Sequence, residues 1–237
     1  MSVADNIAHI RERIQAAAKR AGRDVSEISL MAVSKTLPPD SIREAYDAGI
    51  RVFGENRVQE FAGKIEALRV LAGAHWHLIG HLQTNKAAKA AELFHAVDSV
   101  DSVRLAKKLN EAAATTDKKL SVLLEINVGG EAAKTGIDAG SAELDHLLSL
   151  APQFDHLEIR GLMTIPPFTE NPQQARPFFR KLRELRGQIA GRRLPSVSMD
   201  VLSMGMSHDF EVAIEEGSTC VRVGTAIFGK RDAAPQP

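Results

Sequence analysis

The feature that most constrains the fold is a regular alternation of short apolar runs with longer segments in which apolar residues recur at helical spacing. Such a run, bounded by turn residues, is typical of a buried strand. Eight runs fit this description: residues 30–33, 50–53, 75–80, 94–97, 121–127, 157–163, 195–203 and 220–223. Because strict alternation of strands and helices implies parallel strands with right-handed crossovers, the sequence predicts an α/β fold.

Eight strand–helix units in about 220 residues fit a closed barrel. An extra amphipathic helix, with apolar residues at Val3, Ile7, Ile10 and Ile14, precedes the first strand. We therefore expect a single (β/α)8 TIM-type barrel domain over residues 1–231 and a disordered tail at 232–237. The alternative is an open doubly wound sheet, but no GxGxxG follows the first strand, which counts against its dinucleotide-binding form.

Charge and cysteine content narrow the classes of partner. Thirty basic and thirty acidic residues give a formal net charge of zero, so nothing favours a nucleic-acid or membrane partner. The single cysteine, Cys220, excludes an intrachain disulfide and suits a reducing compartment. The sequence has no run of 18 apolar residues and no signal-peptide pattern at its start. We expect a cytoplasmic protein.

Two common kinds of catalytic site find little support. A zinc site is disfavoured because there is no HExxH, and His75 with His77 offers only two ligands on one strand face. A serine hydrolase is disfavoured because the sequence has no GxSxG elbow. We expect no bound metal.

Lys35 stands at the carboxyl end of the first predicted strand, directly after the apolar residues 30–33 and Ser34. A lysine beside a hydrophobic core has two possible roles. Its stem packs while the ammonium reaches solvent, which is the common case. Alternatively, desolvation lowers the pKa of the amine and makes it a nucleophile.

The loops after the seventh and eighth strands carry an anion-binding pattern. Ser203, Gly205 and Ser207 precede a short helix, and Gly224 and Thr225 follow the last strand. Backbone N–H groups at a helix start attract anions, and a phosphate site in these two loops recurs among TIM barrels. The alternative is a pair of ordinary glycine turns, with Ser207 capping the helix.

Arg222 lies inside the last predicted strand and stays charged, so it needs an acceptor. A buried carboxylate such as Glu125 or a ligand atom would serve. His77, taken alone, is more typical of a structural histidine than of a catalytic one. Lys35, the anion loops and Arg222 would all be used by a phosphorylated aldehyde held as a Schiff base.

Several motifs, spread over nearly the whole chain, occur together in one known family. They are residues 32–36 (AVSKT), 53–56 (FGEN), 58–60 (VQE), 76–80 (WHLIG), 82–86 (LQTNK), 134–136 (KTG), 161–163 (GLM), 202–207 (LSMGMS) with Asp209, and 221–229 (VRVGTAIFG). In these the sequence resembles the pyridoxal phosphate homeostasis protein family, small single-domain relatives of the alanine racemase barrel.

The resemblance implies that pyridoxal 5'-phosphate (PLP) is the cofactor and forms a Schiff base with Lys35. It implies phosphate contacts from Ser207, Gly224 and Thr225, Arg222 facing the pyridine nitrogen, Asn56 and His77 lining the ring, and further cofactor contacts from Met163, Ser203, Gly205 and Met206. A permanently charged arginine against the pyridine nitrogen disfavours its protonation and makes the ring a poorer electron sink.

The resemblance also implies a function: a non-enzymatic protein that holds PLP and takes part in intracellular vitamin B6 homeostasis and amino-acid balance. PLP-dependent apoenzymes are the candidate acceptors, and a monomer is the expected state. The first alternative is a PLP-dependent amino-acid racemase. Racemases of the related barrel take a second base, a tyrosine, from a further C-terminal domain, whereas this chain ends soon after the eighth strand and its only tyrosine is Tyr46. A second alternative is a phosphosugar enzyme that uses Lys35 as an aldolase-like amine without a cofactor.

Overall fold

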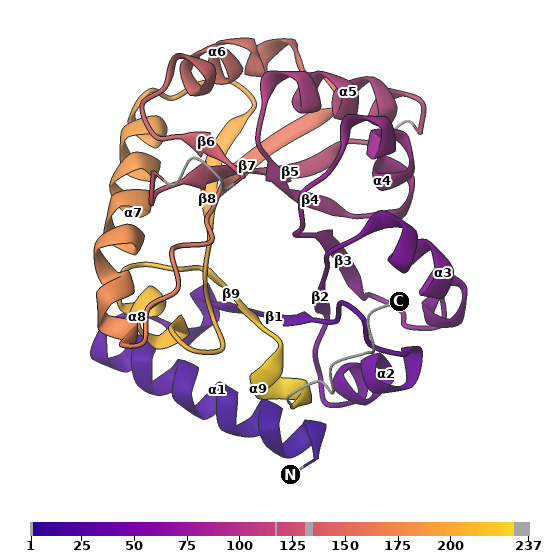
Figure 1. Ribbon diagram of the computed structural model, residues 1–237, viewed down its shortest axis with the longest axis vertical. Coiled ribbons are helices and arrows are strands. Elements are labelled where there is room, and N and C mark those ends of the chain that lie inside the picture. Colours follow the sequence, from indigo (N-terminus) through magenta and orange to yellow (C-terminus); the bar gives the residue numbers. More distant parts are fainter. Residues whose placement is uncertain (1, 117, 131–134, 230–237) are drawn as a thin grey trace.

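The structure, a computed structural model, describes residues 2–116, 118–130 and 135–229. Within them, eight parallel strands form a closed ring. Strand β1 (Ser29–Val33) pairs with both β2 (Val52–Glu55) and β9 (Cys220–Val223), and the pairing of β4 with β5 completes the ring. The remaining ring strands are β3 (His75–Leu78), β4 (Ala96–Val100), β5 (Leu120–Asn127), β7 (Leu157–Met163) and β8 (Val197–Met206). Figure 1 shows these strands around a common centre with the helices outside them.

The predicted (β/α)8 barrel with an extra N-terminal helix is therefore confirmed, and the open sheet is wrong. A two-residue strand, β6 (Ile137–Asp138), pairs with the end of β5 and lies outside the ring. The sequence pattern does not predict it, because two residues show no periodicity. The predicted domain limit at residue 231 and the tail at 232–237 fall outside the described residues and stay predictions.

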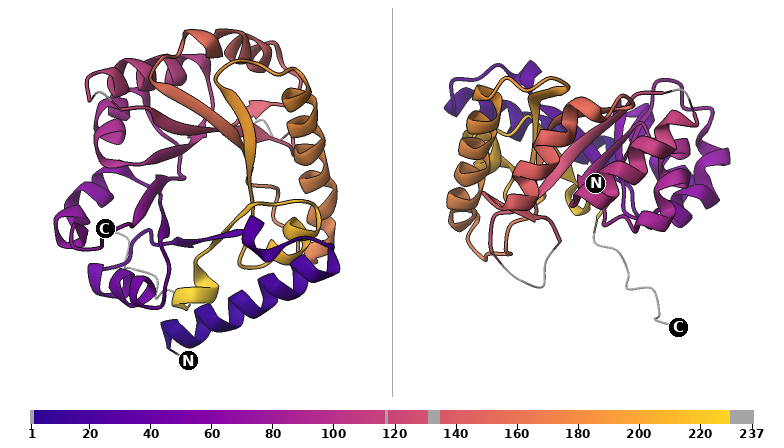
Figure 2. Two further views of the ribbon diagram at one scale, coloured as in Figure 1. Left: turned by 180° about the vertical axis from the view of Figure 1, so that it is seen from behind. Right: turned by 90° about the horizontal axis from the view of Figure 1, so that it is seen from above.

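Helices surround the ring and lie on both sides of it in the edge-on view of Figure 2. They are α1 (Val3–Arg20), α2 (Pro39–Asp47), α3 (Val58–Leu68), α4 (Ala87–Leu93), α5 (Val103–Ala114), α6 (Ala142–Leu150), α7 (Arg176–Gly191), α8 (Phe210–Glu215) and α9 (Thr225–Phe228). Short 3-10 turns occupy Val25–Glu27, Thr84–Lys86, Ala151–Gln153 and Pro172–Ala175. Each helix among the described residues is too short or too polar to cross a membrane.

The extra helix α1 covers the part of the barrel where the chain leaves the last strand. It starts with a capping box between Ser2 and Asp5. Its isoleucines Ile7, Ile10 and Ile14 are buried, and each contributes roughly 1.5–3 kcal/mol. Helix α1 packs against α8 and α9, and Asn6 Nδ2 donates a hydrogen bond to Ile227 O in α9 at 2.8 Å. Because α9 has only four residues, α1 supplies most of the cover on this side.

The main core lies between the ring and the helices. Four aromatic rings run through the core from β2 and β3 to α3 and the end of α4. The ring centroids of Phe53 and Trp76 are 4.9 Å apart, those of Trp76 and Phe61 are 5.0 Å apart, and those of Phe61 and Phe94 are 4.8 Å apart. Offset aromatic pairs of this kind add about 0.5–1.5 kcal/mol each beyond the area they bury. They fix α3 against β2, the strand next to Lys35.

Inside the ring, Met31, Ile79 and Cys220 form a second, smaller buried cluster. Gly54 makes room for it, because a Cβ there would lie 2.8 Å from the Met31 sulfur and 3.0 Å from Ile79 Cδ1. The interior is therefore a packed plug.

The predicted carboxyl ends of four strands are wrong. Strand β3 ends at Leu78 rather than at residue 80, and β4 ends at Val100 rather than at residue 97. The second strand is Val52–Glu55 rather than residues 50–53, because Glu55 still pairs with Leu78, and helix α3 begins at Val58. Strand β8 continues to Met206, which pairs with Arg222, rather than ending at Ser203. Hydrophobic pattern alone misses such ends, where the pairing continues through polar residues and glycine.

Candidate functional site

A cavity of about 270 Å³ opens at the carboxyl ends of β1, β2, β8 and β9. This is the end of a barrel at which TIM-barrel sites occur. It is lined by Val33, Lys35, Asn56, Ile79, Ile165, Phe168, Met206, Ser207, His208, Arg222, Gly224 and Thr225. The structure therefore brings seven of the eleven predicted cofactor-binding residues to one cavity. The other four are His77, Met163, Ser203 and Gly205.

Lys35 follows β1, and its side chain is half-buried. Val33 and Lys35 both line the cavity, so the alternation of the strand, with every second residue facing inward, continues past its end. The residue between them, Ser34, is fully buried and faces the other way, towards Glu55. This alternation is what directs the amine of Lys35 to the barrel mouth.

The anion loops meet at Ser207. Its Oγ accepts hydrogen bonds from the backbone N–H groups of Gly224 and Ala226, both at 3.3 Å. These donors lie at the start of α9, for which Gly224 is the N-cap residue. The alternative that Ser207 caps helix α8 is wrong, because its hydroxyl is directed to the neighbouring loop and Asp209 is the N-cap residue of α8.

Asp209 has a different structural role. Its Oδ1 accepts a hydrogen bond from Met206 N at 2.6 Å, which holds the turn between β8 and α8. Burial raises the pKa of Asp209, while the Met206 N–H and the nearby Arg222 charge oppose that shift. The turn thus presents Ser207 to the loop after β9.

Arg222 is buried, 3% exposed, and is held by two hydrogen bonds at the same end of the barrel. Its Nη1 donates to Ser203 Oγ at 2.7 Å, and its Nη2 donates to Thr164 O at 2.7 Å. It does not pair directly with Glu125, whose Oε1 accepts a hydrogen bond from Thr135 Oγ1 at 2.7 Å. Burial lowers the pKa of Arg222, but nearby acidic groups oppose the shift, and a guanidinium keeps its charge in proteins. Ser203 therefore positions the arginine that lines the cavity.

His77 lies on β3, and its Nδ1 is 3.0 Å from Asp98 Oδ1 on β4. Burial lowers the pKa of His77, but the charge of Asp98 and its hydrogen bond outweigh that effect, so the net shift is upward. His77 is not among the residues that line the cavity. Met163 is fully buried at the end of β7, between β5 and β8.

Asn56 directly follows β2 and lines the cavity. Its position depends on Gly80, which follows β3, because a Cβ at Gly80 would lie only 2.3 Å from Asn56 O. Two neighbouring strand ends thus approach each other so closely that only glycine fits between them.

Gly205 is required by packing. Its φ is +93°, and a Cβ there would lie 2.5 Å from Ala213 Cβ and 2.9 Å from Phe210 Cα. The family resemblance implies that Gly205 contacts the cofactor. In the structure, the absence of a side chain at Gly205 allows helix α8 to pack closely against β8. This packing fixes the turn that carries Ser207.

Comparisons with known proteins connect this geometry to a family. Residues 6–232 match the family described as alanine racemase, N-terminal domain. The chain is 46% identical over 231 residues to the pyridoxal phosphate homeostasis protein of Aquifex aeolicus, covering 98% of this chain and 99% of that protein. It is 45% identical over 233 residues to the protein of the same name in Escherichia coli, covering 97% of each. The chain belongs to the pyridoxal phosphate homeostasis protein family.

A solved structure supports the same assignment and the fold. PipY of Synechococcus elongatus, determined with PLP bound, matches with a TM-score of 0.84 and 36% identity, over 96% of this chain and 100% of that chain. The resemblance inferred from the sequence motifs is therefore confirmed.

In this member of the family, sequence reasoning missed five residues of the cavity wall: Val33, Ile79, Ile165, Phe168 and His208. Ile165 and Phe168 lie in the loop after β7 and are 44% and 82% exposed. Their place after a strand end is a signal that could have identified them, but apolar residues carry no chemistry of their own.

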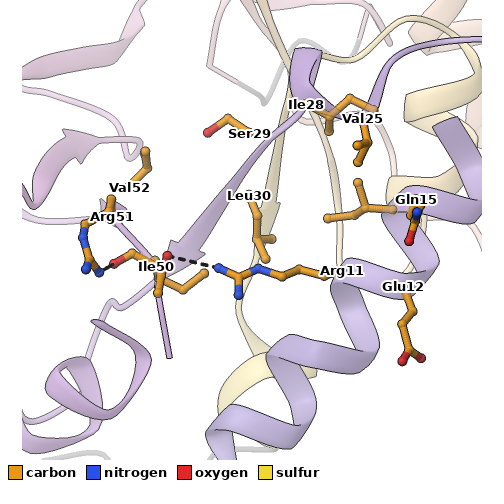
Figure 3. Close-up of a pocket in the computed structure, with 12 residues that line it drawn as sticks. Arg11, Glu12, Gln15, Val25, Ile28, Ser29, Leu30, Ile50, Arg51 and Val52 are labelled. Carbon is orange, nitrogen blue, oxygen red and sulfur yellow. Dashed lines mark hydrogen bonds between the residues drawn. The ribbon is translucent and has the colours of Figure 1, made fainter. Parts of the chain in front are cut away.

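A larger cavity, of about 550 Å³, lies at the opposite end of the barrel, between α1 and the starts of β1 and β2 (Figure 3). Arg11 extends across it, and its guanidinium donates to Ala48 O at 3.1 Å and Gly49 O at 3.0 Å. This larger cavity is not the candidate site, because the residue that extends across it, Arg11, serves to join α1 to the loop before β2. Among the residues that the structure describes, no three histidine, cysteine or acidic side chains gather as metal ligands.

Proposed function

We propose that this chain binds PLP in the cavity at the carboxyl ends of β1, β8 and β9, and that Lys35 holds it as a Schiff base. The observation that carries this proposal is that Lys35, Arg222 and the Ser207–Gly224 contact share one cavity. The cofactor bound to PipY and the names of the relatives agree with it. An amine, a set of anion donors and a fixed cation are the groups that a phosphorylated pyridine aldehyde requires.

The donor set fits each part of PLP. For the phosphate there are the N–H groups of Gly224 and Ala226 and the hydroxyls of Ser207 and Thr225. A phosphate would replace Ser207 Oγ as the acceptor of two backbone donors, and its dianion would gain from the helix start.

The ring is accommodated by apolar walls from Val33, Ile79 and Met206, with the amide of Asn56 beside them. Arg222 would face the pyridine nitrogen. When bound, PLP supplies an electron sink for reactions at the carbon next to an amine. Arg222 keeps its charge and opposes a proton on the ring nitrogen, so this protein weakens that sink.

We further propose that the protein is not an enzyme and that it takes part in PLP homeostasis and amino-acid balance, passing PLP to apoenzymes. The curated names of its relatives favour this. The position of Tyr46 also favours it, since its hydroxyl donates to Ala72 O at 2.6 Å. Ala72 precedes β3, so this tyrosine lies towards the amino-terminal ends of the strands, away from the cavity. A monomer and a cytoplasmic location stay predictions.

The first experiment tests cofactor binding. Purified protein reconstituted with PLP should absorb at about 420 nm, and borohydride should fix the cofactor covalently to Lys35 in a peptide map. Lys35→Ala should lose both signals. Lys89→Ala, which breaks an exposed pair with Glu92 on α4, should keep them. A wild-type protein without either signal would contradict the Schiff base and favour the cofactor-free amine.

The second experiment separates storage from catalysis. Loaded protein is mixed with an apoenzyme that requires PLP, and the gain of activity is followed against free PLP. In parallel, L- and D-amino acids are tested for racemisation. Transfer without racemisation supports the proposal. Sustained racemisation that Lys35→Ala abolishes would instead establish a racemase.

A further inference from the structure

Both chain neighbours of Lys35 are held by one group of charged residues on the outer side of the barrel. The group consists of Glu55 at the end of β2 and of Glu60 and Lys64 on α3, and we refer to it as the Lys64 clamp. Glu60 and Lys64 are four residues apart and therefore share one face of α3. The clamp does not line the cavity.

Every polar group of Ser34, the residue before Lys35, takes part in a hydrogen bond. Its N–H donates to Gly54 O at 2.9 Å, and its hydroxyl donates to Glu55 Oε1 at 2.5 Å. Its carbonyl accepts a hydrogen bond from Lys64 Nζ at 3.0 Å, and Lys64 Nζ also lies 2.9 Å from Glu55 Oε1. Lys64 thus joins the backbone before Lys35 to a buried carboxylate.

Thr36, the residue after Lys35, has a φ of +62°, a left-handed conformation that is costly for a β-branched residue. Its N–H donates to Glu60 Oε1, and Lys64 reaches the same carboxylate at 3.5 Å. Lys64 Nζ also donates to Leu37 O at 3.4 Å. The turn that carries Lys35 is therefore held from both sides by α3.

The clamp is a poor source of fold stability, because burying its charged groups costs desolvation free energy. Glu55 is fully buried, and Lys64 is 8% exposed. Burial raises the pKa of Glu55 in spite of Lys64, and its Oε2 has no hydrogen-bond partner. Apolar residues of similar volume stabilise such a position as well as a buried ion pair or better. An ion pair differs from apolar residues in making directional hydrogen bonds. In the clamp these hydrogen bonds go to the backbone on both sides of Lys35.

We propose that Lys64, together with Glu55 and Glu60, is a positioning residue for Lys35: it maintains the turn at residues 34–37, with its left-handed Thr36, and so holds the lysine amine in the cofactor cavity to which the strand alternation directs it. This inference rests on the proposed function, because it assigns the clamp a part in forming the Schiff base. It predicts that loss of the clamp slows bond formation on Lys35 more than it weakens retention of the phosphate.

The test uses Lys64→Met and, as a milder change, Glu60→Ala, since Glu60 is only half-buried. The control is Leu109→Ala in α5, which removes a fully buried side chain remote from Lys35 and tests the effect of lost stability alone. We expect the rate of Schiff-base formation with PLP, followed by absorbance, to fall at least tenfold in both clamp variants. It should stay within about twofold of wild type in the control.

A second readout needs no cofactor. Amide hydrogen exchange at Ser34 and Thr36 should accelerate in the clamp variants of the unloaded protein, and in Leu109→Ala only as far as its global stability falls. If wild type binds no PLP, the proposed function fails. If wild type forms the Schiff base but both clamp variants do so at the same rate, or with unchanged exchange at these amides, the positioning role is wrong and the binding function stands.

Discussion

Ser207, which follows β8, accepts a hydrogen bond at 3.3 Å from the backbone N–H of Gly224, which follows the adjacent strand β9. This contact joins the two loops that the sequence indicates as an anion site. We expect Ser207→Ala with Thr225→Ala to lower PLP affinity about a hundredfold or more, because each of the two lost hydrogen bonds to a charged group is worth about 1.5–3 kcal/mol. The free energy of unfolding without PLP should change by only about 1 kcal/mol.

Equilibrium titration with PLP and urea unfolding measure the two quantities. Ser149→Ala is a matched control, because that hydroxyl donates to His146 O on the exposed side of α6. Equal losses of affinity and stability in the double variant would mean that the two hydroxyls act as structural caps.

The pairing of His77 with Asp98 predicts an upward shift of the His77 pKa, and mutation of Asp98 should reverse the direction of that shift. Burial alone lowers the pKa of His77, and Asp98 more than offsets it. In wild type the imidazole should titrate above 6.5, and in Asp98→Asn below it, as NMR of the ring protons measures. Since the pKa is raised in the folded state, the stabilisation is complete below pH 6.5 and is lost as the pH rises through the folded pKa. An unchanged pKa in Asp98→Asn would show that the carboxylate is not the cause.

Cys220 gives the protein a dependence of stability on alkaline pH. Burial raises the pKa of its thiol from 9.0 to about 12. Below pH 9 both folded and unfolded thiols keep their proton, so nothing changes. Above it, the unfolded thiol ionises first, and stability falls by about 1.4 kcal/mol for each pH unit until the folded pKa is reached.

The measurement compares urea unfolding of wild type and Cys220→Ala from pH 8 to 10.5. Subtracting one profile from the other cancels the contributions of the groups that the two proteins share. Parallel profiles for the two proteins would refute the raised pKa. The native thiol should also resist disulfide reagents until the protein unfolds.

Gly205→Ala should destabilise the protein by about 2–5 kcal/mol, combining left-handed strain with overpacking against α8. Gly187→Ala in α7 is the matched control. A Cβ at Gly187 meets no atom within 4 Å, so alanine there should be neutral or stabilising by about 1 kcal/mol. Urea unfolding compares the two variants, and a Gly205→Ala protein as stable as wild type would disprove the packing role.

The fold class could be predicted from sequence because its signal is repeated eight times. A single mistaken strand boundary does not change the alternation that implies a parallel barrel. The ends of β2 and β8 were wrong because pairing there continues through Glu55, Gly205 and Met206, which interrupt the apolar pattern. Those ends are where the site lies.

The site was predictable to the extent that its residues carry chemistry. Lys35, Ser207 and Arg222 stand out as a nucleophile, an anion ligand and a cation at strand ends. The apolar wall of Ile165 and Phe168 carries no such signal. Neither does the role of Lys64, because its partner carbonyl at Ser34 is 30 residues away in sequence and only the packing of α3 on β2 brings them together.

The ring is closed by the pairing of β1 with β9, which joins Ser29 to Cys220. During synthesis, β1 leaves the ribosome long before its second neighbour exists, so the barrel can close only after Cys220–Val223 has been made. The same late segment brings Arg222 and the donors of Gly224 and Ala226. We therefore expect that nascent chains cannot capture the cofactor, and that a premature stop after residue 200 abolishes barrel closure and phosphate binding together.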